Sequence, residues 1–260
     1  MASPTFESVG VNDIATGTPR SPAIPTGVVN GSFVLVVEGI SSNGDRTGNT
    51  SGGAGTWAEF VKSLNTSGSF MVDWKVATGT DSTPGTYSTP AHATLLGKTA
   101  ALRFSGVHPT VPFHATTNSA TGSTSTIPTV SLASLPECTI VVLYQSQSSG
   151  STTNTITTPP SIGGTPMTQR DANTPGQFHF LTHEWAGGSA TASGGVTNNG
   201  PANRAFMFAL LPSSAPAITE DVIIGGAKKT VTVRSEMTAG AKKTVPTASV
   251  IIGGAKKTTV

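Results

Sequence analysis

The sequence predicts an all-β protein: a jelly-roll-like antiparallel β-sandwich followed by a short, prism-like C-terminal β-hairpin repeat. The first observation behind this prediction is a series of short apolar stretches separated by Gly/Ser/Thr/Asn segments. The second is that no stretch of about 11 residues shows a convincing 3.6-residue apolar period. The third is a repeated, hairpin-like unit near the C-terminus. Together these features favour a loop-rich structural protein over a long helical enzyme.

Composition agrees with this fold class. Charged residues make up 11% of the 260 residues, well below the roughly 25% usual in soluble domains, and 30 residues are glycine. The single cysteine, Cys138, excludes an internal disulfide framework. No apolar run approaches the ~18 residues that cross a bilayer, so we expect no membrane span. Residues 1–10 lack the pattern of a secretory signal.

The predicted strands share a short length and a border of turn-forming residues. In chain order they are Ser32–Ile40, Thr56–Leu64, Ser69–Ala77, Thr99–Val107, Thr139–Gln145, Gln177–Trp185 and Asn203–Leu211. In Ser69–Ala77, an apolar set that begins at Phe70 alternates with a set that contains Asp73 and Lys75. A period of two places the first set in the core and the second toward solvent. Thr139–Gln145 is apolar on both faces, as expected of a central strand.

The chain is predicted to have three regions. Residues 1–30 contain several prolines and no periodic pattern, which indicates an N-terminal arm or linker. Residues 31–213 form the sandwich, and residues 218–260 form a repeat segment that mediates oligomerisation. Within the sandwich, Ser32–Ile40 is similar to Thr139–Gln147, and later strands also match in order. Two similar β-layers that face each other would give one sandwich.

The C-terminal segment repeats Ala-Lys-Lys-Thr at Ala227, Ala241 and Ala255, at intervals of 14 residues. Val-Ile-Ile favours a strand, Gly-Gly permits a turn, and Lys-Lys-Thr-Val returns as a second strand. A lone hairpin is marginally stable in water, so these hairpins need each other or a partner chain. We expect a symmetric homotrimer; a disordered basic tail is the alternative. The residues expected to mediate self-assembly are Ile223, Ile224, Lys228, Lys229, Lys242, Lys243, Ile251, Ile252, Lys256 and Lys257.

The charge of the chain is concentrated in this segment. Residues 218–260 hold seven Lys or Arg and three Asp or Glu, a net charge of +4. Such a tail can attract nucleic acid or other anionic polymers. The alternative is that the lysines keep strand edges soluble. We favour the second interpretation and expect no nucleic-acid partner.

No motif in the sequence predicts a catalytic residue, a metal site or a cofactor. Gly97-Lys98-Thr99 is similar to the end of a phosphate-binding loop, but His92 stands where that motif needs glycine. His179 and His183 share a strand face, yet Glu184 would point the other way. The carboxylates are scattered, and no Gly-x-Ser-x-Gly motif occurs. We therefore expect no enzyme.

Aromatic residues beside glycine-rich turns are the candidates for sugar binding. Trp57 and Trp185 could stack on sugar rings, whereas Trp74 alternates with core residues and is expected to be buried. Cys138 opens a predicted strand and is interpreted as a small buried apolar residue.

Several segments together resemble a known family. They are Gly31-Ser-Phe-Val-Leu-Val-Val, Gly55-Thr-Trp-Ala-Glu-Phe-Val, Val72-Asp-Trp-Lys-Val-Ala-Thr and Leu102-Arg-Phe-Ser-Gly-Val-His-Pro-Thr-Val-Pro. Their order is similar to a β-sandwich domain in minor tail proteins of actinobacterial phages, mycobacteriophages among them. The tail units are similar to the Val-Gly-Gly-x-Lys-x-Val repeats that close many such proteins. The resemblance covers about residues 30–260. Ser105 and His108 stand where that family often has Arg and Asp.

The resemblance implies a non-enzymatic component of a phage virion, at the tail tip or in a fibre, with host-surface attachment as a further role. Its partners would be copies of itself, other tail or virion proteins, and a host cell-wall glycan. The expected location is the virion, assembled in the host cytoplasm. The alternatives are a carbohydrate-binding adhesin module, a head-decoration protein and a wall-glycan depolymerase.

Overall fold

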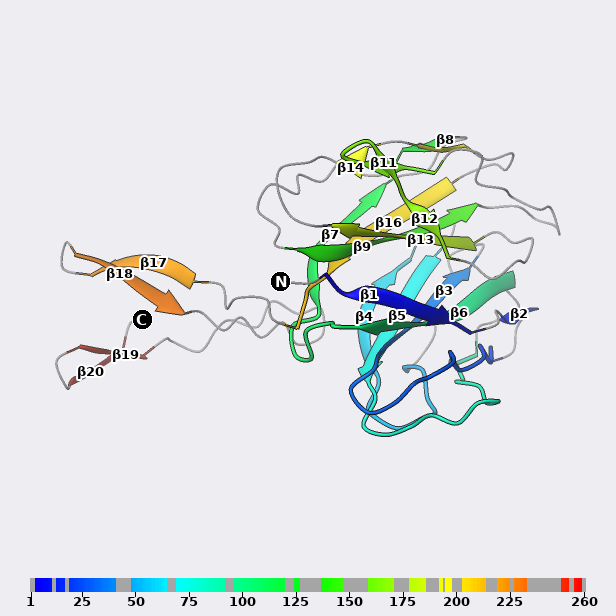
Figure 1. Cartoon of the computed structure of the whole chain (residues 1–260), viewed down its shortest axis with the longest axis horizontal. Helices are drawn as coiled ribbons and strands as arrows, with labels where there is room; N and C mark the ends of the chain where they lie inside the picture. The colour runs from blue at the N-terminus through cyan, green and yellow to red at the C-terminus, as the bar shows by residue number, and fades with distance from the viewer. Residues whose placement is uncertain are drawn as a thin grey trace. The chain divides into compact units, whose positions relative to one another are not determined.

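The fold is described from a computed structural model of the whole chain (Figure 1). The structure describes residues 3–10, 13–16, 19–40, 48–64, 69–91, 96–119, 124–126, 137–146, 159–170, 178–185, 192–193, 195–197, 203–213, 219–224, 227–232, 249–252 and 255–258. These residues form strands, turns and loops and contain no helix, which confirms the predicted all-β class. The chain divides into two compact units, Met1–Ala215 and Pro216–Val260, and each is described by itself.

The first unit contains a sheet built from the first half of its chain. Its strands are β1 (Thr5–Val9), β2 (Asp13–Thr16), β3 (Phe33–Ile40), β4 (Ala58–Ser63), β5 (Ser69–Val76) and β6 (Leu96–Ser105). The order is β1-β6-β3-β5-β4, with β2 also pairing with β6, and every pairing is antiparallel. The central strand β3 is buried along its whole length, which its apolar residues on both faces explain.

A second antiparallel sheet comes from the second half. Its strands are β7 (Phe113–Ser119), β9 (Cys138–Ser146), β12 (Thr168–Gln169), β13 (Phe178–Trp185) and β16 (Asn203–Leu210), in the order β12-β13-β9-β16-β7. The sequence predicts a central position for β9, and the structure confirms it. The smaller pairings involve β8 (Thr124–Thr126), β10 (Ser161–Ile162), β11 (Thr165–Pro166), β14 (Ala192–Ser193) and β15 (Gly195–Thr197).

The two sheets face each other across one apolar core (Figure 1). Alternate residues of each strand enter this core, as the period of two predicts. The buried members are Phe33, Leu35, Val37, Phe70, Val72, Ala100, Leu102 and Phe104 from the first sheet, and Val141, Leu143, Phe180, Phe206, Phe208 and Leu210 from the second. Burying one such Phe or Leu side chain contributes about 1.5–3 kcal/mol. The first unit is therefore a two-layer β-sandwich.

Aromatic contacts join the edge strands of one sheet to those of the other. On one side, Phe60 of β4 stacks on Phe113 of β7, with ring centroids 3.5 Å apart. On the other side, Phe6 of β1 packs edge-on against Phe104. The guanidinium of Arg170, which follows β12, lies 4.8 Å from the Phe6 ring centroid. Both sides of the sandwich are thus closed by contacts between sheets.

The two sheets share one strand order. Each strand of the first order has a counterpart at the same place in the second order, read from β7 to β12. The corresponding strands are β1 and β7, β6 and β16, β3 and β9, β5 and β13, and β4 and β12. This correspondence matches β3 with β9, the strands whose sequences are similar. The chain completes the first sheet before it enters the second, whereas a jelly roll is built from two Greek keys. The jelly-roll part of the prediction is not confirmed by this topology.

The structure shows how two segments of the first unit are placed. Within the predicted arm of residues 1–30, the described residues pack on the first sheet: β1 pairs with β6, and residues 19–31 cover the outer face. The second set of Ser69–Ala77 does not face solvent, because loops bury Asp73 and Lys75 completely. Trp74 does pack beside the core, as predicted, and lies against Phe33 with ring centroids 5.6 Å apart.

The described residues of the second unit form two antiparallel hairpins. In one, β17 (Thr219–Ile224) pairs with β18 (Ala227–Thr232), and in the other β19 (Ser249–Ile252) pairs with β20 (Ala255–Thr258). Their registers correspond: Ile224 lies opposite Ala227, and Ile252 opposite Ala255. The middle repeat, with Lys242 and Lys243, lies outside the described residues. The three-hairpin stack and the trimeric prism stay predictions.

Candidate functional site

The outer face of the first sheet is covered by loops and holds a second apolar cluster with buried charges. Side chains of β3, β5 and β6 that point away from the core meet residues of segments 19–31, 48–57 and 77–91. The apolar members are Val28, Val34, Val36, Trp57, Ala77, Tyr87 and Ala101. Glu38, Asp73 and Lys75 lie among the polar residues of this face, and none has exposed surface. Charges buried this completely need partners.

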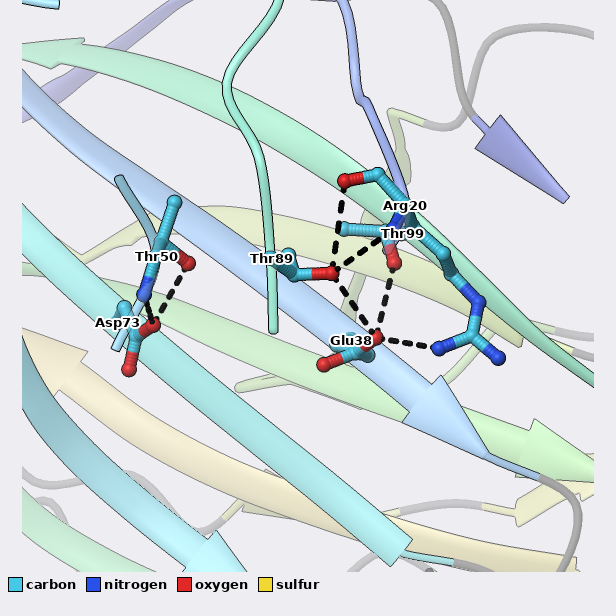
Figure 2. A network of polar contacts seen from close by, with 6 residues as sticks. All are labelled: Arg20, Glu38, Thr50, Asp73, Thr89 and Thr99. Carbon is cyan, nitrogen blue, oxygen red and sulfur yellow. Dashed lines mark hydrogen bonds and ion pairs between the residues drawn. The ribbon is translucent and has the colours of Figure 1, made fainter. Parts of the chain in front are cut away.

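Figure 2 shows the first polar group, which is centred on Glu38. Arg20 Nη1 donates a hydrogen bond to Glu38 Oε1 over 2.6 Å, and both side chains are fully buried. The hydroxyl groups of Thr89 and Thr99 lie 3.5 and 3.4 Å from the same oxygen. The Thr89 hydroxyl also accepts a hydrogen bond from the Arg20 amide. One carboxylate of β3 thus holds two covering segments against the sheet.

Asp73 forms the second polar group, which is also visible in Figure 2. Its Oδ2 accepts hydrogen bonds from the amide and the hydroxyl of Thr50, each 2.6 Å long. Hydrogen bonds to a charged acceptor contribute about 1.5–3 kcal/mol. Because Thr50 belongs to segment 48–57 and Asp73 to β5, this group fixes a further loop over the outer face.

The third group surrounds the ammonium of Lys75. Lys75 Nζ lies 2.8 Å from Asp81 Oδ2, and the Tyr87 hydroxyl donates to the same oxygen over 2.6 Å. The Ala54 amide donates to Asp81 Oδ1, also over 2.6 Å. Lys75 Nζ lies 4.9 Å from the Trp57 ring centroid and 4.7 Å from that of Tyr87. An amine and a carboxyl group are therefore enclosed together by aromatic rings and backbone donors.

These contacts shift the pKa values of two members. Burial alone would raise the pKa of Asp81, but hydrogen bonds from Lys75, Tyr87 and the Ala54 amide outweigh it and lower that pKa. Burial, reinforced by Asp81, raises the pKa of Tyr87 far above its usual value. At neutral pH, Asp81 is therefore a carboxylate, and the Tyr87 hydroxyl stays protonated as a donor.

Trp57, predicted as a sugar platform, belongs to this covered cluster. Its side chain is 9% exposed, and its indole N–H donates to the Gly52 carbonyl over 2.8 Å. Tyr87 packs edge-on against the ring, and Lys75 lies over it. Trp57 therefore lacks the open ring face that stacking on a sugar requires. The burial follows from the covering loops, which the sequence pattern does not reveal.

Trp185, the other predicted platform, is the last residue of β13. It packs against apolar residues on the face of the second sheet that points away from the core. Its side chain is half-buried. Its carbonyl accepts a hydrogen bond from the Ser3 hydroxyl, and its buried indole N–H has no partner within the described residues. Sugar binding at Trp185 stays a prediction.

The strand histidines lie on the outer face of the second sheet. His179 is buried and stacks on Tyr144, with ring centroids 6.3 Å apart. His183 is half-buried, and its pKa is lowered by burial, an effect that Glu184 partly offsets. Among the residues that the structure describes, no three His, Cys, Asp or Glu side chains gather as metal ligands would.

Cys138 is fully buried, as predicted, and burial raises the pKa of its thiol to about 12. Within the described ranges, no helix has the length and apolar character of a membrane span.

The hairpin register places the predicted self-assembly residues on two faces. In an antiparallel ladder, residues directly opposite each other share a face, and faces alternate along a strand. Ile223 therefore shares a face with Lys228, and Ile224 shares the other with Ala227. In the second hairpin, Ile251 pairs with Lys256 and Ile252 with Ala255. Lys229 and Lys257 lie opposite Val222 and Val250, on the faces of Ile224 and Ile252.

The fold and this covered face define the class of the first unit: an all-β, two-sheet sandwich with loops fixed over one outer face by buried ion pairs. No known family model, curated protein or solved structure matches the chain.

Proposed function

We propose that this chain is a structural component of a phage virion, a minor tail, tail-tip or fibre protein whose C-terminal segment joins copies of the chain. The observation that carries the proposal is the pair of hairpins with corresponding register in the second unit. The resemblance to phage minor tail proteins supplies the class of particle. The multivalent particle would attach to a host surface through weak contacts repeated on many copies.

The hairpins support self-association because each leaves apolar residues on one face. By register, Val222, Ile224, Ala227 and Val231 share a face of the first hairpin, with Glu220 and Lys229 toward its open end. A two-stranded hairpin has no second layer to cover such a face, and alone it is marginally stable. Hairpins of identical chains match one another in length and spacing. A second and a third copy of the chain can therefore bury the apolar residues of this face.

The sandwich supports a structural role through its fixed loops. Buried ion pairs and charge-assisted hydrogen bonds hold three segments over the first sheet. Such contacts favour one arrangement of the loops over many. A particle protein that must present the same surface in every copy benefits from this rigidity.

Labelling of intact particles tests the assignment. Gold-labelled antibodies raised against residues 1–215 would be added to purified particles of a phage that encodes this chain, and the label would be located by electron microscopy. The proposal predicts gold at the tail tip or along fibres. Label over the head would support the head-decoration alternative, and particles without the chain would contradict a virion role altogether. Release of sugars from host wall material by the purified chain would instead indicate a depolymerase.

A further inference from the structure

The buried pair of Lys75 and Asp81 contains groups that can react with each other. Both side chains have no exposed surface. Among the described residues, Arg20 and Glu38 form a second fully buried pair, but a guanidinium does not act as a nucleophile in proteins. A lysine amine, by contrast, is a strong nucleophile once it has passed a proton to a neighbouring group.

The contacts around Asp81 are those that an attack on its carboxyl carbon needs. Lys75 Nζ lies 2.8 Å from Oδ2. The Ala54 amide donates to Oδ1 over 2.6 Å and would stabilise negative charge that develops on that oxygen. The Tyr87 hydroxyl donates to Oδ2 over 2.6 Å and would keep this hydrogen bond to the oxygen as it departs. The amine, a donor to Oδ1 and a donor to Oδ2 thus all contact the same carboxyl group.

The surroundings exclude water from the pair. The rings of Trp57 and Tyr87 lie beside the ammonium, and segment 52–54 closes over it. At Gly53, an added Cβ would lie 2.3 Å from Lys75 Nζ and 2.5 Å from Asp81 Oδ2, so the backbone itself touches both groups. Dry surroundings favour condensation over hydrolysis, and fixed neighbours react as if highly concentrated.

We infer that Lys75 and Asp81 join in an intramolecular isopeptide bond. A proton moves from the ammonium to Oδ2, and the free amine attacks Cγ. The Nζ–Cγ bond forms and the Cγ–Oδ2 bond breaks. Oδ2 leaves as water with two of the three ammonium protons, and the third stays on the amide nitrogen. The three ammonium protons account for every proton in the products, so no oxidant or co-reactant is needed.

The bond has a physical benefit for the fold. Two charges buried in this way cost several kcal/mol each in lost hydration, and a neutral amide removes both. It also ties the segment after β5 to the sheet that it covers. This inference concerns the sandwich alone and does not depend on the proposed function.

Tryptic mapping of the purified full-length chain tests the inference. Trypsin cuts after Lys62, Lys75 and Lys98, and no other Lys or Arg lies between Lys62 and Lys98. The bond would remove the charge at Lys75 and block that cut. We expect one peptide, residues 63–98, lighter than its sequence by one water molecule. Two peptides of unmodified mass, residues 63–75 and 76–98, would overturn the inference.

Three variants complete the experiment. Lys75→Arg keeps the charge but removes the nucleophile, so its peptides should have full mass. If the Lys75→Arg protein still lacks one water molecule, the Asp81 side chain has lost that water by reacting with its own backbone. In that case the inference fails. Tyr87→Phe keeps the ring and should slow the loss of water at least several-fold. Lys62→Arg, on the exposed β4 position, is the matched control and should show the wild-type loss.

Discussion

Glu38, Asp73 and Lys75 show how single residues fix the covered face of the first sheet. Each points away from the core, and each is paired with a group from a covering segment. Because one partner left alone would be a buried, uncompensated charge, removing either member of such a pair costs about 3–5 kcal/mol. The loops and the sheet are therefore stabilised together.

His183 gives a pH dependence at this scale. Its pKa is lower in the folded chain than the ordinary value of 6.5, so the unfolded chain binds more protons below that value. Its contribution to stability is present above pH 6.5 and is lost as pH falls through the folded pKa. We expect the urea midpoint to fall between about pH 7.5 and about pH 5. His183→Gln should reduce this fall; an equal fall in both proteins would contradict the assignment.

The residue pattern predicts which side of a strand is apolar, but not what covers the other side. The alternation in β5 correctly places Phe70 and Val72 in the core. The alternation wrongly places Asp73 and Lys75 at the solvent. Loops rich in Gly, Ser and Thr bury these residues, and such loops have no sequence period that would predict that they cover the sheet. The burial of Trp57 has the same cause: its position beside a glycine-rich turn favours exposure, but Tyr87 and Lys75 from later segments lie against its ring.

At the scale of elements, Gly53 shows how closely segment 48–57 approaches β5. Gly53 has a φ of +69°, and its Cβ would overlap Lys75 and Asp81. Gly31 has a φ of +84° with open space around it. Gly31→Ala should cost about 1–2 kcal/mol of unfolding free energy from backbone strain alone. Gly53→Ala should cost clearly more in the same urea titration; equal losses would show that the close approach is absent.

The hairpin register predicts which isoleucines matter most for assembly. Ile224 and Ile252 lie opposite alanines and share their faces with Val222 and Val250 as well as one lysine each, whereas Ile223 and Ile251 lie directly opposite lysines. The double variant Ile224→Thr/Ile252→Thr should therefore weaken self-association at least tenfold, measured by sedimentation over a concentration series. The matched variant Ile223→Thr/Ile251→Thr should weaken it less. The reverse order would mean that the other face forms the contact.

Elements with a strong local signal are the ones that the sequence predicts well. β3, β5, β13 and β16 fall within predicted strands, and β9 extends one residue beyond each end of its predicted range. Each of these strands has an apolar alternation or run bordered by turn residues. β1 lies in a segment without a clear period, and it forms because β6 offers a free edge. Short strands such as β10, β11 and β12 are likewise defined by their partners, so local sequence does not reveal them.

For the whole molecule, the shared strand order of the two sheets explains how one chain makes a closed sandwich. Each half supplies one layer, and the edge contacts Phe60–Phe113 and Phe6–Arg170 close the two sides. The faint similarity of the halves anticipates two facing layers, but it does not determine the strand order within each. That order depends on pairings between strands far apart in the chain.

Self-assembly through the second unit is the central property that we propose for the chain. Light scattering during size-exclusion chromatography would compare the molar mass of the full-length chain with that of residues 1–215, the compact first unit. We predict a trimer for the full-length chain and a monomer for residues 1–215. A full-length monomer, or the same stoichiometry for both proteins, would contradict the claim.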